Sequence, residues 1–190
     1  MQDQSSDVKR NSDVFLKLAD TVNQSVPARR LVEYKLQHRP NGNPRYWAIV
    51  DFNQHSAKKR FYLFDTREEK VTQYYVAHGK GSEGKSDDGM ADVFSNASGS
   101  NCSSLGIYLC LDEYVGKHGK SLRLEGLEPT NSNAQARSVV LHSANYVSDE
   151  FINKYGRIGR SEGCLVFENP LVGDIVDKLE NGSFIIAWKK

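Results

Sequence analysis

The sequence predicts a mainly β protein of the α+β class. Short runs dense in β-branched and aromatic residues recur along most of the chain, which is typical of strands in a half-buried sheet. The segments between the first of these runs are rich in Asn, Gly, Pro, Ser and Thr, residues that favour tight turns. Helical periodicity is confined to a few short segments, so we expect the helices at the periphery of a sheet.

The first helical segment covers residues 12–22, with Ser12 as the expected N-cap. The apolar residues of one face are Val14, Phe15, Leu18, Ala19 and Val22. We expect this face to pack against the rest of the protein. The chain is therefore divided into a polar lead with a packing helix, residues 1–25, and a single compact domain, residues 26–190.

The expected strands follow this helix. They lie at residues 30–37, 45–52, 59–65, 70–78, 104–112, 120–127, 137–143, 164–168 and 182–188. Turn residues at 39–44, 53–59 and 66–69 give the first strands hairpin spacing, which favours antiparallel pairing. The Gly-, Ser- and Asp-rich residues 79–104 form a connection of a length that is often functional or mobile in a compact domain.

Two short helices are expected in the second half of the chain. The first covers residues 148–156, with a serine N-cap, acidic residues in the first turn and a glycine at its end. The second covers residues 169–182, where Asn169 is the cap, Pro170 takes the first helical position and Gly182 ends the helix. Its apolar face is formed by Leu171, Val172, Ile175, Val176 and Leu179.

The composition limits the function. Lysine and arginine number 25 against 24 aspartate and glutamate residues, so a net charge of +1 creates no strong field for nucleic acid. No run approaches the roughly 20 apolar residues that span a bilayer, and the N-terminus lacks the apolar core of a signal peptide. We expect a soluble chain with no transmembrane segment and no nucleic-acid partner.

The three cysteines leave at least one thiol unpaired. Cys102 and Cys110 can pair only if the chain turns back between them, because eight residues of extended strand span roughly 26 Å. Whether they pair stays open. The five histidines are scattered and no Cys-x-x-Cys pair exists, so the spacing predicts no metal site and no cofactor.

Residues 79–86, "GKGSEGKS", match the phosphate-loop pattern G-x-x-x-x-G-K-[ST]. A phosphate loop needs a helix directly after it, because the helix N-terminus completes the phosphate site. Here Gly89, Asn96 and Gly99 interrupt the following segment, and antiparallel strands do not favour the sheet of such proteins. We expect no nucleotide at this match, and its two lysines as solvated charges.

A cysteine and a histidine near the C-terminal end have the outline of a nucleophile and its base. One expected strand ends at His142-Ser143, and Cys164 follows Gly163 at the head of another. A thiol is mostly protonated at neutral pH, so a nucleophilic cysteine needs an imidazole, and the oxyanion needs an N–H pocket. We expect the sulfur within hydrogen-bond reach, or slightly farther, of a His142 ring nitrogen. The alternative is a small buried cysteine and a core histidine.

His142-Ser143 and the run from Ser161 through Glu162, Gly163 and Cys164 to Leu165 resemble the signature of the L,D-transpeptidase catalytic domain. The similarity to murein L,D-transpeptidase catalytic domain proteins continues through "VAHGKGS", "FSNASGSNCSSLGIYL", "YVGKHGKSLRLEGLE", "LHSANYVS" and "GRIGRSEGC", and covers residues 46–188. The resemblance implies a YkuD-like β-sandwich of mixed strands with a few short peripheral helices.

The resemblance also implies an exported enzyme, in the periplasm or at the cell envelope, that acts on the tetrapeptide stems of peptidoglycan. Cys164 maps to the nucleophile that attacks the carbonyl at the L-centre of the third-position diamino acid, commonly meso-diaminopimelate, and expels the terminal D-alanine. An amine of a neighbouring stem then takes the acyl group. His142 maps to the general base, the Ser143 carbonyl to the group that orients its ring, and the Cys164 N–H, with Gly163 as a second candidate, to the oxyanion hole.

This sequence departs from the family pattern beside the nucleophile. Many relatives carry His before the Gly-Cys pair and Arg or Asn shortly after it, whereas Glu162 precedes it here and Val166 with Phe167 follow. Substrate contacts from those positions are therefore in doubt. Candidate replacements are Ser161, Arg160, Arg157, Arg123, Tyr114 and His118, and the arginines among them suit a stem carboxylate. The arginines also fit plain surface roles, and Ser161 a local turn.

Other functions stay open. Water in place of the acceptor amine makes the protein an L,D-carboxypeptidase. A catalytically silent wall-binding module keeps the fold while Glu162 disables the site. A cysteine protease of another fold cleaves ordinary L-peptides.

Overall fold

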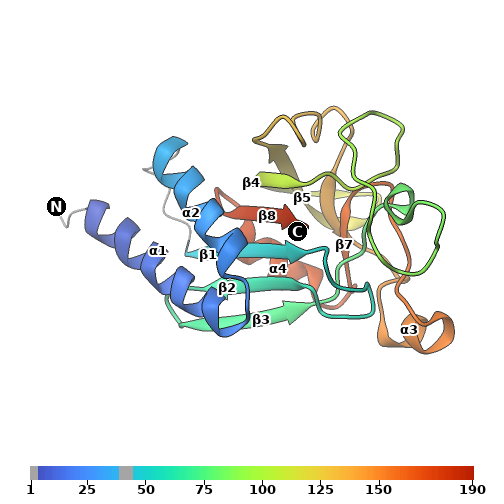
Figure 1. Ribbon diagram of the computed structural model, residues 1–190, viewed down its shortest axis with the longest axis horizontal. Coiled ribbons are helices and arrows are strands. Elements are labelled where there is room, and N and C mark those ends of the chain that lie inside the picture. Colours follow the sequence, from blue (N-terminus) through green and yellow to red (C-terminus); the bar gives the residue numbers. More distant parts are fainter. Residues whose placement is uncertain (1–3, 39–44) are drawn as a thin grey trace.

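The structure is a computed structural model that describes residues 4–38 and 45–190. Its helices are α1 (Gln4–Thr21), α2 (Ser25–His38), η1 (Lys80–Glu83, a 3-10 helix), α3 (Asp149–Tyr155) and α4 (Val172–Leu179). Its strands are β1 (Tyr46–Asp51), β2 (Phe61–Asp65), β3 (Lys70–Tyr74), β4 (Gly106–Gly116), β5 (Gly119–Gly126), β6 (Val140–Ser143), β7 (Leu165–Phe167) and β8 (Phe184–Trp188) (Figure 1). Within these residues no helix is both long and apolar enough to cross a membrane. The expected turn at 39–44 lies outside the described residues.

The strands form one eight-stranded sheet in the order β3-β2-β1-β8-β4-β5-β6-β7. Hairpin spacing gives the expected antiparallel pairs β1-β2, β2-β3 and β4-β5, whereas β1-β8 and β6-β7 are parallel. The mainly β fold with mixed strands and short peripheral helices is therefore confirmed.

The sheet curls over onto itself. The rings of Phe61 on β2 and Phe167 on β7 lie 4.8 Å apart, although their strands are near opposite ends of the strand order. Beyond β3, the Ala77 N–H donates to the Val166 carbonyl at 2.9 Å and ties the two ends together. The two layers of the expected sandwich are thus halves of one continuous sheet. The apolar face of α4 packs into the core between them.

Helices α1 and α2 cover the outer face of the sheet (Figure 1). Phe15 of α1 stacks on Trp47 of β1 with the ring centroids 4.6 Å apart, so the expected packing helix is confirmed. The N-cap assignment of Ser12 was wrong. The helix begins upstream, and the Ser12 hydroxyl donates to the Val8 carbonyl one turn back at 3.0 Å.

Residues 30–37 are helical, so the strand expected there was wrong. The buried positions of α2 include Ala28, Leu31, Val32 and Lys35, which share one helical face. The local density of Leu, Val and Tyr favours a strand. In the fold, however, β1 and β8 pair directly with each other and leave no room for another strand between them. The helix instead covers the outer core of that sheet.

Of the two later helices, one is as expected and one is shorter. The Ser148 hydroxyl accepts from the Phe151 N–H at 3.1 Å, and Gly156 ends α3 in the left-handed region, as the sequence indicates. Helix α4 begins at Val172 and ends at Leu179, short of Gly182. The N-cap position is Leu171, so the expected cap Asn169 and the expected first residue Pro170 both lie before the helix.

Candidate active site

A cleft of about 560 Å³ lies where the β4–β5 turn, the start of β6 and the loop before β7 meet. It is lined by six of the residues singled out from the sequence: Tyr114, His118, His142, Arg160, Ser161 and Cys164. Segments from distant parts of the chain therefore converge on one concave surface, as a candidate active site requires.

Strand register places Cys164 and His142 on the same face of the sheet. In the parallel pair β6-β7, Leu141 lies opposite Leu165 and His142 opposite Val166. Leu141 and Leu165 belong to the inner core. Side chains alternate along a strand, so His142 and the residue just before Leu165 face the other way, into the cleft.

The His142 ring is held in one tautomer. Its Nδ1 lies 3.0 Å from the Ser143 carbonyl oxygen, which can only accept, so Nδ1 carries the proton and Nε2 keeps a lone pair. His118 stacks on this ring with the centroids 4.2 Å apart. Burial lowers the pKa of His142; the Ser143 hydrogen bond opposes this, and His118 and Lys117 add to it. The imidazole is therefore neutral, and suited to accept a proton, at pH 7.

The Cys164 thiol is half-buried and protonated. Its sulfur donates to the Ser138 carbonyl and accepts from the Val140 N–H, both at 3.5 Å. Burial raises the thiol pKa, while the Val140 N–H and the Arg137 charge oppose this. No hydrogen bond joins the Cys164 sulfur to the His142 ring directly, so the expected approach of the sulfur to within hydrogen-bond reach, or slightly farther, stays a prediction. The thiol must leave the Ser138 carbonyl before its proton can pass to the imidazole.

The loop before Cys164 leaves the backbone N–H of the nucleophile candidate itself available. The Gly163 N–H donates to the Ser161 hydroxyl oxygen at 3.1 Å, and that hydroxyl donates to the Cys164 carbonyl at 2.8 Å. Ser161 thus has the local loop contacts that the sequence left as an alternative, and the Gly163 N–H is already engaged. The Cys164 N–H makes no hydrogen bond with the described part of the chain, and can hold an oxyanion.

Arg160 lines the cleft but is bound to acids of the phosphate-loop-like segment. It pairs with Glu83 at 3.1 Å and with Asp87 at 2.5 Å. Glu83 is buried and also contacts His78 Nε2 at 3.1 Å, while His78 Nδ1 lies 2.6 Å from an Arg60 nitrogen. Burial, with Arg60 next in effect, lowers the pKa of His78 to about 2, so this ring is neutral.

The backbone of the same segment is engaged with its neighbours. The Gly79 N–H donates to the Ser103 hydroxyl, the Lys80 N–H to the Ser161 carbonyl and the Gly81 N–H to the Asn101 carbonyl. The Lys80 ammonium pairs with Glu162 at 3.1 Å. These donors are therefore directed at the protein itself. The segment braces the loop that carries Cys164.

Two of the candidate arginines lie outside the cleft. Arg123 pairs with Asp112 and covers the Tyr114 ring at 4.4 Å. It lines a neighbouring cavity of about 330 Å³ that shares Tyr114, Ser138 and Val140 with the cleft. Arg157 donates to Asp87 at 2.9 Å. Sequence reasoning missed Arg137, Lys117 and Tyr146, which do line the cleft. No local motif marks them, since they face Cys164 only after folding.

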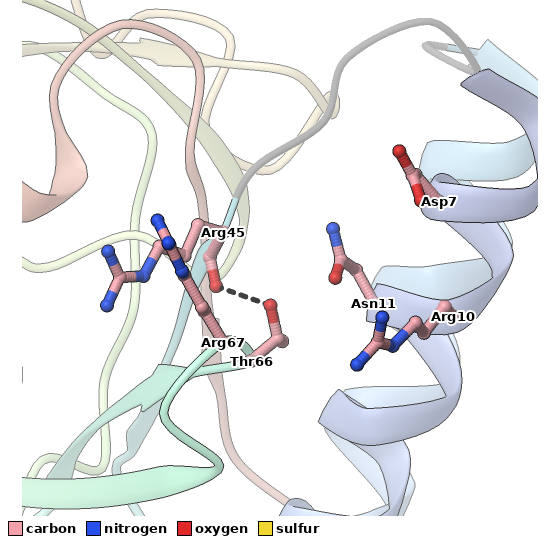
Figure 2. Close-up of a pocket in the computed structure, with 6 residues that line it drawn as sticks. All are labelled: Asp7, Arg10, Asn11, Arg45, Thr66 and Arg67. Atoms are coloured by element: carbon pink, nitrogen blue, oxygen red, sulfur yellow. Dashed lines mark hydrogen bonds between the residues drawn. The ribbon is translucent and has the colours of Figure 1, made fainter. Parts of the chain in front are cut away.

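Two other polar surfaces of the described residues contain neither a cysteine nor a histidine. Figure 2 shows a cleft of about 460 Å³ lined by Asp7, Arg10, Asn11, Arg45, Thr66 and Arg67. Asp65 binds Arg45 through two hydrogen bonds of 2.7 Å, which compensates the charge of this guanidinium. Glu113, Asp177 and Glu180 form a surface acidic group in which Lys120 pairs with the first two. All three cysteines are free thiols.

The comparison with protein families identifies the chain. The model of the L,D-transpeptidase catalytic domain (YkuD_2) matches residues 18–188. The chain belongs to the L,D-transpeptidase catalytic domain family. No curated protein sequence matches it.

Solved structures of L,D-transpeptidases are similar at low identity. An L,D-transpeptidase from Mycobacterium smegmatis aligns at 14% identity and a TM-score of 0.46, covering 78% of this chain and 61% of that one. One from Mycobacterium tuberculosis H37Rv aligns at 15% identity and a TM-score of 0.42, covering 77% and 59%. The helical cell shape determining protein Pgp2 from Campylobacter jejuni aligns at 15% and 0.43, covering 76% and 48%. The chain thus spans less than two thirds of the length of these structures.

Proposed function

We propose that this protein is a peptidoglycan L,D-transpeptidase in which Cys164 is the nucleophile and His142 the general base. The observation that carries the proposal is that one cleft is lined by both a half-buried thiol and an imidazole whose Nδ1 proton is held by the Ser143 carbonyl. Family membership points to the substrate class, the tetrapeptide stem of peptidoglycan.

In the first half-reaction, His142 Nε2 takes the thiol proton and the sulfur bonds to the carbonyl carbon at the L-centre of the third residue. The carbonyl electrons move to oxygen, and the Cys164 N–H donates to this oxyanion. When the oxyanion collapses, the bond to the D-alanine nitrogen breaks. The leaving amine takes the proton from the imidazolium, and a thioester remains on Cys164.

In the second half-reaction, the amine of a neighbouring stem attacks the thioester. It passes a proton to His142, the new amide forms as the carbon–sulfur bond breaks, and the released thiolate recovers this proton from the imidazolium. Water in place of the amine gives the L,D-carboxypeptidase reaction. Tyr114, His118, Ser161 and Arg160 are the proposed substrate contacts of the cleft. Arg123 is proposed to contact the substrate from the neighbouring cavity.

We also propose that the protein acts after export, in the periplasm or at the cell envelope, because its substrate is cell-wall material. The chemistry uses only a thiol, an imidazole and backbone groups. It therefore needs neither a metal nor an organic cofactor.

The test is to incubate the protein with disaccharide-tetrapeptide and to read the products by mass. Cross-linked dimers with release of D-alanine are expected from the native protein, and none from Cys164→Ala. Tripeptides without dimers would assign the carboxypeptidase alternative. Unchanged tetrapeptide would favour the silent wall-binding module, and cleavage of casein without action on the muropeptide a protease.

A further inference from the structure

Arg137, in the segment before β6, lies under the loop that carries Cys164. Its guanidinium donates to the Ser95 carbonyl at 2.9 Å and to the Cys102 carbonyl at 2.6 Å. The hydroxyl groups within its reach are Ser100 at 3.3 Å and Ser104 at 3.5 Å. Arg137 thus fastens residues 95–104, here called the strap, to the edge of the cleft.

The strap and Arg137 press against the residue before the nucleophile. A Cβ atom on Gly163 would lie 2.8 Å from the Cys102 carbonyl oxygen and 3.1 Å from Arg137 Nη2. Gly163 also has a φ of +121°, which disfavours any other residue. The position of Arg137 is therefore coupled through one glycine to the position of Cys164.

The charge of Arg137 is not compensated by an acid. All four of its acceptors are neutral, and no carboxylate pairs with it within residues 45–190. Two other cations beside the Cys164 loop do have acidic partners, since Arg160 pairs with Glu83 and Asp87, and Lys80 with Glu162. A half-buried guanidinium without a counter-ion favours negative charge on neighbouring groups.

We propose that Arg137 is a positioning residue that holds a permanent positive charge beneath Cys164 and clamps the strap against Gly163. This inference rests on the proposed function of Cys164. The charge stabilises the thiolate and the oxyanion that form in turn above it. Arg137 does not grip the substrate, because both of its terminal nitrogens are occupied by the strap.

Other charged groups near Cys164 also act on the pKa of its thiol. Lys117 of the β4–β5 turn favours the thiolate, and Glu162 of the nucleophile loop opposes it. His142 and His118 stack on each other in the lining of the cleft, and Tyr146 also lines it. Burial raises the Cys164 pKa, whereas the charges of Arg137 and Lys117 both lower it, and Arg137 has the larger effect of the two.

The test is the pH dependence of Cys164 alkylation by iodoacetamide, followed by intact mass with Cys164→Ala as the blank. In Arg137→Gln we expect the midpoint of thiolate formation to rise by ~1 unit and the rate at pH 7 to fall by about tenfold, with the high-pH plateau unchanged. The matched control, Arg30→Gln, removes a guanidinium of α2 that pairs with Glu128 outside the cleft, and is expected to leave the midpoint in place. This readout needs no peptidoglycan, so it can succeed or fail independently of the product assay.

Arg137→Lys separates the effect of the positive charge from the effect of the hydrogen bonds that hold the strap. It keeps the charge but cannot span both strap carbonyls, so the midpoint is expected to stay near the native one while the strap becomes more sensitive to limited proteolysis. An unshifted midpoint in a folded Arg137→Gln, or an equal shift in Arg30→Gln, would overturn the proposal. If Arg137→Gln does not fold, a rise of a full unit in Arg137→Lys would overturn it as well.

Discussion

At the scale of single residues, the site is defined by where two protons lie. One is on His142 Nδ1, because the Ser143 carbonyl can only accept, and this leaves Nε2 as the basic nitrogen. The other is on the Cys164 sulfur, whose pKa burial raises. Both groups are therefore neutral before reaction. A neutral pair in a partly desolvated cleft avoids burying two charges and creates them only during attack.

The lowered pKa of His142 predicts a pH profile. The folded-state pKa lies below the ordinary value of 6.5, so the basic form persists through neutral pH and is lost only in more acidic solution. Acylation of Cys164 by a carbapenem, followed by intact mass, should fall with a midpoint below 6.5. In His142→Gln the rate should drop by roughly 10²–10⁴ and the acidic limb should vanish. A midpoint above 6.5 would contradict the assignment of this base.

Cys164→Ala should remove turnover while keeping the fold. The thiol is half-buried and its polar contacts are two long ones to backbone groups, so we expect a loss of about 1 kcal/mol or less. Thermal melts then shift by only a few degrees. Cys110→Ala is the matched control, since this thiol is fully buried in the inner core. A larger shift for Cys164→Ala than for Cys110→Ala would support the reading of Cys164 as a packing residue.

At the scale of elements, the nucleophile loop owes its shape to a segment distant in sequence. Two backbone hydrogen bonds join Ser161 to this segment, residues 78–83. The Ser161 N–H donates to the His78 carbonyl, and the Lys80 N–H donates to the Ser161 carbonyl. Glu83 of η1 then holds Arg160. The sequence could predict β6, β7 and the residues they carry, because apolar runs and a signature mark them. It could not predict the roles of Glu83 and Arg137, because Arg160, which binds Glu83, and the strap, which binds Arg137, lie tens of residues away from them.

Glu83→Gln tests the brace. Removing one partner of a buried ion pair costs about 3–5 kcal/mol, but Arg160 is 29% exposed and keeps Asp87, so we expect about 1–3 kcal/mol. The control is Glu162→Gln, which breaks the exposed pair with Lys80 and should cost less than about 1 kcal/mol. Urea unfolding measures both. Equal losses in the two variants would show that the buried carboxylate is not a brace.

The phosphate-loop-like segment should not bind nucleotides. The N–H groups of Gly79, Lys80 and Gly81 already donate to the protein, and within the described residues no α-helix directly follows the match to complete a phosphate site. Melting in millimolar Mg-ATP or Mg-GTP should be unchanged, whereas a ligand at 100 times its dissociation constant would add about 2.7 kcal/mol. An upward shift that disappears in Lys85→Ala would contradict this expectation.

At the scale of the whole molecule, one curled sheet brings the proposed reacting groups together. Its closure places residues after β3 against β7, so the brace, Cys164 and His142 meet at one end of the sheet. Strands and hairpins follow from local patterns and were predictable. The curl depends on the packing of α4 and of Phe61 against Phe167, which no short segment reveals. The local pattern of α2 likewise favours a strand, because the place of this helix outside the sheet is a property of the assembled fold.

The most direct test of the central claim is the intact mass of the protein quenched in acid during its first turnover of disaccharide-tetrapeptide, without added acceptor. We predict an added mass equal to the disaccharide-tripeptide acyl group. Peptide mapping should place it on Cys164, and it should be absent from Cys164→Ala. Products that form with no adduct, or an adduct on Cys102 or Cys110, would contradict Cys164 as the nucleophile.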